Sequence, residues 1–151
     1  MEAAYEEIRA KHDLPPFKKT DSEFDISGIE PKGNLLKEVL QHLHRKVERT
    51  AQLVQDIVNP SGDTVVDLIE SSFFTQEDRA KLASVEKEIM VAYRKILVAQ
   101  YENNDAAIAK AISQIVEQWP TIRKSLLPYL RKLPTGWQER TVTKEILEYM
   151  G

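Results

Sequence analysis

The sequence predicts an all-α protein, an antiparallel bundle of about five to seven helices with an extended N-terminal arm. Two long segments repeat apolar residues at alternating steps of three and four, which keeps one face of a helix toward a partner. No segment of usable length shows the two-residue alternation of a β-strand. The 151 residues are 42% hydrophobic and 30% charged, a composition and length typical of one folded domain.

The N-terminal part, residues 1–33, is predicted to be a short helix followed by an extended acidic arm. Its opening AAYEEIRAK favours a helix, and Leu14, Pro15 and Pro16 then push the backbone into extended geometry. Residues 13–33 contain turn formers without a helical period. A segment of this kind either docks in a groove as an arm or is a disordered tail, and the sequence leaves both open.

The helical bundle is predicted to occupy residues 34–151, and its first long helix spans 34–59, where Asn59 and Pro60 end it. Asp63 is then expected to cap a short helix. A second long helix is predicted from Thr75, with Asp78 completing its cap, to about Glu102. The apolar seams of the two long helices are Leu36, Leu40, Leu43, Val47, Thr50, Val54 and Ile57, and Leu82, Val85, Ile89, Ala92, Ile96 and Ala99.

Three further helical segments are predicted after Asn104. Asp105 is expected to cap a helix that Pro120 ends, and its apolar stripe consists of Ile108, Ile112, Ile115 and Trp119. Residues 122–133 are predicted to be helical again, with Pro128 either kinking or dividing the helix. A last short helix is predicted over 142–150, capped by Thr141 or Thr143.

Two of the three histidines, His42 and His44, lie in the first long helix near glutamates. A separation of two residues turns the helix by about 200 degrees, so the two rings face opposite ways and cannot chelate one ion. Glu38 with His42, and His44 with Glu48, share a face at the four-residue step, but the Glu-x-x-His step of di-iron bundles is absent. The pattern indicates a solvated helix face, and we expect no metal and no cofactor.

The sequence shows no catalytic motif. It has no cysteine, none of its five glycines forms a phosphate-binding loop, and it contains no G-x-S-x-G elbow. Its acidic residues fall mostly on the polar sides of amphipathic helices. We therefore expect a protein that is not an enzyme, with an enzyme whose site has no recognisable motif as an alternative.

The function that the sequence favours is a non-enzymatic protein–protein interaction module, a helical scaffold or adaptor subunit of a complex. Apolar residues of the arm and two C-terminal aromatic residues are its candidate partner-binding groups: Phe24, Ile26, Ile29, Tyr129 and Trp137. Alternatively, Phe24 and Trp137 complete the core of their own chain. The acidic arm could also strap across basic residues of its own bundle or of a second copy, which would give a homo-oligomer.

A basic segment near the C-terminus suggests a nucleic-acid-associated subunit as the other alternative. Five basic residues are interleaved with Tyr129 and Trp137, as in grooves that grip and stack single strands: Arg123, Lys124, Arg131, Lys132 and Arg140. The formal net charge of -3 weighs against a dominant electrostatic footprint. Neither a signal peptide nor an apolar run of about 20 residues occurs, so we expect a cytoplasmic protein without a membrane segment.

Overall fold

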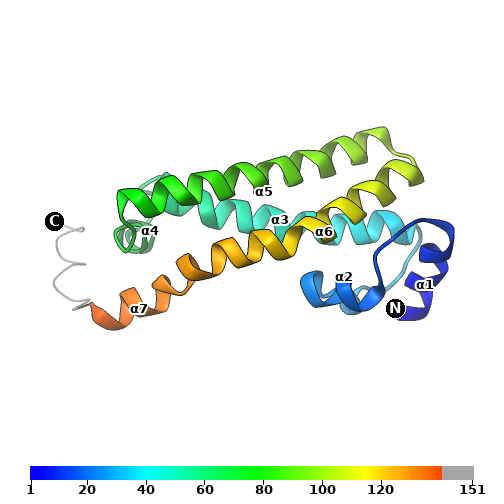
Figure 1. The fold of residues 1–151 in the computed structure, drawn as a ribbon, viewed down its shortest axis with the longest axis horizontal. Coiled ribbons are helices and arrows are strands. Elements are labelled where there is room, and N and C mark those ends of the chain that lie inside the picture. Colours follow the sequence, from blue (N-terminus) through cyan, green and yellow to red (C-terminus); the bar gives the residue numbers. More distant parts are fainter. Residues whose placement is uncertain (141–151) are drawn as a thin grey trace.

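The computed structural model describes residues 1–140, and every regular element within them is helical (Figure 1). Three long helices form the centre: α3 (Leu35–Val58), α5 (Gln76–Glu102) and α6 (Asp105–Leu130). The chain runs up, down and up through them, and α5 packs against both α3 and α6. The predicted all-α antiparallel bundle is therefore confirmed.

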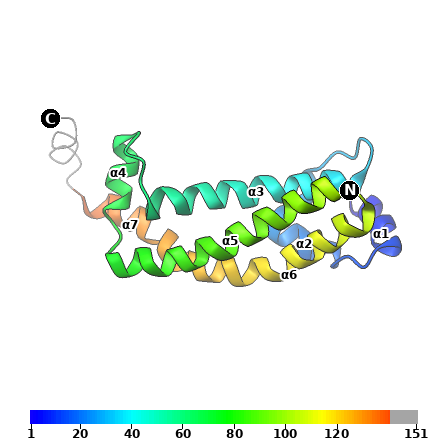
Figure 2. The same cartoon turned by 90° about the horizontal axis from the view of Figure 1, so that it is seen from above.

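Pairs of short helices lie at the two ends of this three-helix centre (Figure 2). At one end, α1 (Glu2–Lys11) and α2 (Phe17–Phe24) pack on α3, and a 3-10 turn over Ile26–Gly28 follows. At the other end, α4 (Val65–Ser71) packs on α3 and contacts α7 (Lys132–Glu139). None of the described helices combines the length and the apolar character needed to cross a bilayer.

The predicted seams form the core. All six seam residues of α5 are buried, and so are the four of the α6 stripe. In α3 every seam residue is buried except Thr50, which is half-buried and donates its hydroxyl hydrogen bond to the carbonyl of Lys46. Burial of each aliphatic side chain contributes about 1.5–3 kcal/mol, so these three stripes supply most of the driving force for folding.

The caps follow the predictions closely. Thr75 and Asp78 form a capping box at the start of α5, as predicted. The predicted caps Asp63 and Asp105 are each wrong by one residue, because Thr64 and Asn104 accept the capping hydrogen bonds of α4 and α6. Asp105 instead occupies the first position of α6, where its charge favours the positive end of the helix dipole.

The expected break at Pro120 is wrong, because α6 continues through both Pro120 and Pro128 as one helix of 26 residues. Each internal proline costs about 3 kcal/mol of helix stability. Trp119, Ile122 and Leu126 are buried on the same face, and burying each contributes about 1.5–3 kcal/mol. The burial of this face is thus large enough to offset the cost of the two prolines. The helix ends at Leu130 and α7 begins at Lys132, so the predicted helix over 122–133 is also wrong in its bounds.

The N-terminal segment is docked and partly helical. Helix α2 was not predicted, because its eight residues are mostly polar and its four buried positions, Phe17, Thr20, Glu23 and Phe24, are too few to show a period. Asp25, with a φ of 51°, ends it in the left-handed region. The predicted helix over 142–150, with Thr141 or Thr143 as its cap, lies outside the described residues.

Candidate protein-binding groove

The arm residues singled out by the sequence lie in the chain's own core. Phe24 and Ile26 are fully buried, and the Phe24 ring packs against Trp119 with ring centroids 5.4 Å apart. Ile29 is half-buried against the same core. These contacts correspond to the alternative in which Phe24 completes the core of its own chain. Phe24 and Ile26 have almost no exposed surface with which to contact a partner.

The two C-terminal aromatic residues are also engaged within the chain. The indole N–H of Trp137 donates to Oε2 of Glu70 at 3.1 Å, and its ring meets Phe73 edge-on with centroids 5.8 Å apart. Tyr129 is half-buried, with the Lys132 ammonium 5.9 Å from the centre of its ring. Trp137 thus joins α7 to α4, and both rings are only partly accessible.

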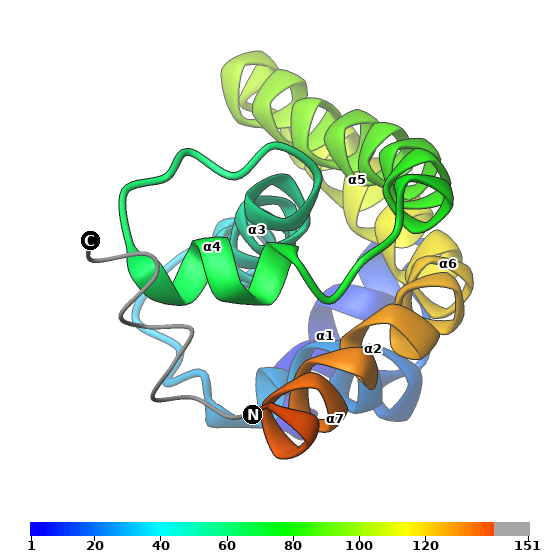
Figure 3. The same ribbon diagram turned by 90° about the vertical axis from the view of Figure 1, so that its left-hand side faces the viewer.

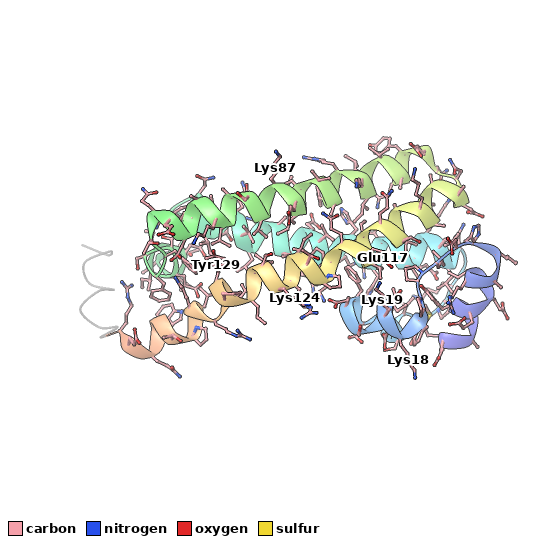
Figure 4. The ribbon with its side chains drawn as sticks, viewed as in Figure 1. Lys18, Lys19, Lys87, Glu117, Lys124 and Tyr129 are labelled. Carbon is pink, nitrogen blue, oxygen red and sulfur yellow. The ribbon has the colours of Figure 1, made fainter. Side chains whose placement is uncertain are left out.

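The structure does not gather the five C-terminal basic residues into one basic face. Arg123 donates two hydrogen bonds of 3.1 Å to the carboxylate of Glu23. Lys132 donates to Asp78 at 2.6 Å, and the Arg140 guanidinium lies 4.8 Å from the Phe73 ring centre. Lys124 and Arg131 are exposed, and Figure 4 shows Lys124 pointing outward from α6. The charges that would grip a nucleic acid are therefore mostly committed to internal contacts.

The two histidines of α3 contact different elements. His42 Nε2 lies 2.9 Å from the carbonyl oxygen of Phe24, whereas the His44 ring stacks on Tyr93 of α5 at 5.2 Å. Their rings do not converge, as the two-residue spacing predicts. Within residues 1–140, no group of three or more His, Asp or Glu side chains is placed to hold a metal ion.

The feature that the structure adds is an open groove of about 580 Å³ between the outer faces of α5 and α6. We call it the α5–α6 groove. Its apolar lining consists of Met90, Val91, Val98 and Ala99 from α5, with Ala107 and Ala111 from α6. Its polar rim consists of Lys87, Arg94, Lys95, Glu102, Lys110 and Gln114. Figure 3 shows α5 and α6 along a side of the bundle that no other described helix covers.

Helix α5 supplies this groove because it has apolar residues on two faces. One face is the buried seam. The other begins at Met90 and Val91 and recurs about two and three turns later at Val98 and Tyr101, which are 55% and 84% exposed. Solvent-exposed single apolar residues are ordinary, but a row of them beside an apolar groove is typical of an interaction surface.

Helix α6 forms the opposite wall of the groove, and the apolar residues that it places there have small side chains. Ala111 is buried and Ala107 half-buried, so the wall rises little above the backbone there. Small residues at a helix surface allow another helix to approach closely, since packed helices lie 8–10 Å apart depending on the side chains between them. The arrangement can therefore accept a bulky side chain from outside.

Sequence reasoning missed the groove residues. It considered only the seam positions of α5 and did not examine the apolar residues between them, Met90, Val91, Leu97 and Val98. That second apolar row was a usable signal. What the sequence did not contain was the position of α6, whose alanines turn the row into one wall of a groove.

Comparisons with known proteins do not assign the chain to a family. No family model matches the chain, no curated protein matches it, and no solved structure matches its fold.

Proposed function

We propose that this protein is a non-enzymatic interaction module, a helical scaffold or adaptor, whose α5–α6 groove binds a helix of another protein. The observation that carries the proposal is an apolar groove with valine and alanine walls, open to solvent on the outer side of the bundle. Insertion of an amphipathic helix into a hydrophobic groove is one of the recurring modes of peptide recognition.

The dimensions of the groove fit such a ligand. Its α5 wall runs from Lys87 to Glu102, which at 1.5 Å per residue is roughly 22 Å. A ligand helix of about 15 residues has the same length and presents an apolar side chain to the groove at every turn. Three or four such anchors are typical of helix-in-groove complexes.

Binding should be moderate rather than tight. Each apolar anchor contributes about 1.5–3 kcal/mol when it is fully buried, and association costs an estimated 4–15 kcal/mol in lost freedom. The groove is open and its lining valines are only partly covered, so the anchors are not fully desolvated. A reversible adaptor contact agrees with this balance.

The proposal is tested by capture of the tagged protein's companions from its native lysate, with nuclease present, followed by mass spectrometry. A carboxylate at the groove should remove a groove-bound companion, so Val98→Asp is the test variant. Val66→Asp is the matched control, because Val66 is also an exposed helical valine, 51% exposed, but lies on α4. A companion retained equally by both variants would rule out the groove as its binding site.

A further inference from the structure

We infer that the helix bound in the α5–α6 groove is acidic, with carboxylates flanking its apolar face. This inference rests on the proposed function and names the chemical class of the partner. It follows from the charges on the rim. Lys87, Arg94 and Lys95 line the α5 side and Lys110 the α6 side, against a single acidic residue, Glu102.

The groove rim is net positive, whereas the whole chain is net negative. The protein carries 24 acidic and 21 basic residues, so an average surface would place slightly more carboxylates than amines around any groove. The α5–α6 groove instead has four basic residues and one acidic residue. A local excess of positive charge beside an apolar wall favours and steers partners of opposite charge.

The lysines of the groove rim form no salt bridge with a carboxylate of the described residues. Three lysines in the described part of the chain do have a carboxylate partner: Lys19 with Glu117, Lys81 with Glu77 and Lys132 with Asp78. No carboxylate within residues 1–140 lies within 4.0 Å of the amines of Lys87, Lys95 or Lys110. Figure 4 shows Lys87 pointing away from the bundle. Its charge is thus presented outward.

The spacing of these bases defines the ligand further. Lys87 and Arg94 are seven residues apart on α5, which is two turns or about 10.5 Å. A ligand helix lying along α5 matches them with carboxylates at positions i and i+7 on one edge of its apolar face. Lys110, on the other wall, takes a carboxylate on the opposite edge. Ion pairs at a partly exposed rim are individually weak, so their main effect is on selectivity and rate of association.

Two other occupants agree less well with the rim. A second copy that docked by the same groove would place basic rim against basic rim, since a two-fold interface pairs a patch with itself. An anionic membrane would be met by long protruding apolar side chains, whereas this surface is hollow and its α6 wall consists of alanines. An acidic helix satisfies both the shape and the charge.

The test is a selection from a phage-displayed library of 16-residue peptides. Each peptide has leucine or isoleucine fixed along one helical face, and all other positions are drawn equally from Glu, Lys, Gln and Ser. The full chain is the target, and Val98→Asp is the target for counter-selection. We expect enrichment of Glu over Lys beside the apolar face, with Glu pairs seven positions apart.

Binding of the selected peptides, made synthetically, is then measured by fluorescence anisotropy. The triple variant Lys87→Glu, Lys95→Glu and Lys110→Glu should weaken binding at least tenfold and should prefer peptides with Lys in place of Glu. The control is Lys18→Glu, Lys37→Glu and Lys124→Glu, which changes the net charge equally but lies outside the groove. Figure 4 shows Lys18 and Lys124 on the opposite side from Lys87. The control should bind within twofold of the unmodified chain.

The outcomes separate the inference from the proposed function. Enriched peptides with equal Glu and Lys would overturn the acidic ligand and leave the groove as a helix-binding site. Failure to enrich any peptide over the Val98→Asp target would overturn both. Co-sedimentation with phosphatidylserine vesicles that is lost in the groove triple variant, without peptide enrichment, would assign the surface to a membrane and also overturn both. Dimerisation that Val98→Asp abolishes, seen by analytical ultracentrifugation, would assign it to a second copy with the same consequence.

Discussion

Single residues fix the N-terminal segment to the bundle through a small group of charges. The side chain of Glu23 is only 10% exposed, and its carboxylate accepts two hydrogen bonds from the guanidinium of Arg123. The ammonium of Lys46 donates to the backbone carbonyl of the same glutamate, and burial lowers the pKa of Lys46. One polar cluster therefore joins α2, α3 and α6 through Glu23, Lys46 and Arg123.

Removing the guanidinium leaves a buried carboxylate without its main donor. We expect Arg123→Ala to lower the free energy of unfolding by about 1–3 kcal/mol, the cost of an unsatisfied buried polar group. Urea denaturation followed by circular dichroism measures it. Lys19→Ala is the control, because the Lys19–Glu117 pair joins the same two helices but is exposed, and we expect a loss below about 1 kcal/mol. Equal losses in both variants would contradict the special role of Glu23.

Asp78 should make the stability of the protein depend on pH. Hydrogen bonds from the Lys132 ammonium and the Thr75 backbone N–H hold the pKa of Asp78 below its usual value. A lowered carboxyl pKa in the folded state gives stability that is present above about pH 4 and is lost as the pH falls through the folded-state pKa. Asp78→Asn should therefore unfold more easily than the unmodified chain at pH 7, and this difference should shrink steadily below about pH 4.

The control for this pH dependence is a substitution at Glu77, the residue that precedes Asp78. Glu77→Gln removes the exposed pair with Lys81, and we expect little change in unfolding free energy at any pH. Thermal unfolding across pH 2–7 compares the two variants. A constant difference between Asp78→Asn and the unmodified chain down to pH 2 would show that the carboxylate charge makes no contribution.

At the scale of the elements, α7 approaches the turn that follows α4 very closely at one residue, Gly136. A Cβ atom added to Gly136 would lie 2.4 Å from Cδ2 of Phe73, well inside van der Waals contact. The Phe73 ring is in turn packed edge-on against Trp137, which is hydrogen-bonded to Glu70. Glycine is required here for space, since only its bare Cα lets α7 approach the Phe73 ring this closely.

Gly136→Ala should therefore displace Phe73 and loosen α7, at a cost of about 1–3 kcal/mol for an overpacked contact. In protein labelled with fluorotryptophan, the ¹⁹F resonance of Trp137 should shift while that of buried Trp119 stays in place. Gly33→Ala is the control, because nothing lies within 4 Å of a Cβ added there. An unchanged Trp137 resonance would show that α7 accommodates the methyl group.

The elements were largely predictable because their seams are periodic. In α3 and α5 the three-four alternation predicted the helices and nearly all their buried residues, and the capping and breaking residues predicted their bounds to within one residue. Local rules failed where burial overrides them, as at Pro120, and where a short helix such as α2 has too few apolar positions to show a period. The groove was not predictable in the same way, because it depends on how α6 lies beside Val91 and Val98.

The whole molecule behaves as one packed unit that includes its N-terminal segment. Tyr5 donates its hydroxyl to the carbonyl of Pro15 at 2.7 Å, and Ser113 of α6 donates to the carbonyl of Asp13 at 2.9 Å. Five apolar residues of this segment are buried in the same core as the long helices: Tyr5, Leu14, Phe17, Phe24 and Ile26. The segment is thus part of the core.

Deleting residues 1–33 should abolish cooperative folding. Five buried side chains at about 1.5–3 kcal/mol each represent roughly 8–15 kcal/mol, which matches the whole stability of a typical domain. Circular dichroism of the full chain should show one sharp thermal transition, and the shortened chain should show none. A shortened chain that unfolds sharply near the same temperature would mean that the three long helices are stable alone.

The connection between α5 and α6 has a consequence for the order of folding. Asn103, with a φ of 52°, turns the chain and Asn104 caps α6, so two residues join two long helices whose contacts are local in sequence. Glu23 and Arg123, by contrast, close a loop of 100 residues. We expect φ-values of folding to be high for Ile112→Val and low for Ile26→Val, with similar values contradicting this order. The surface that forms the groove would then exist early, on a hairpin that assembles before the N-terminus docks.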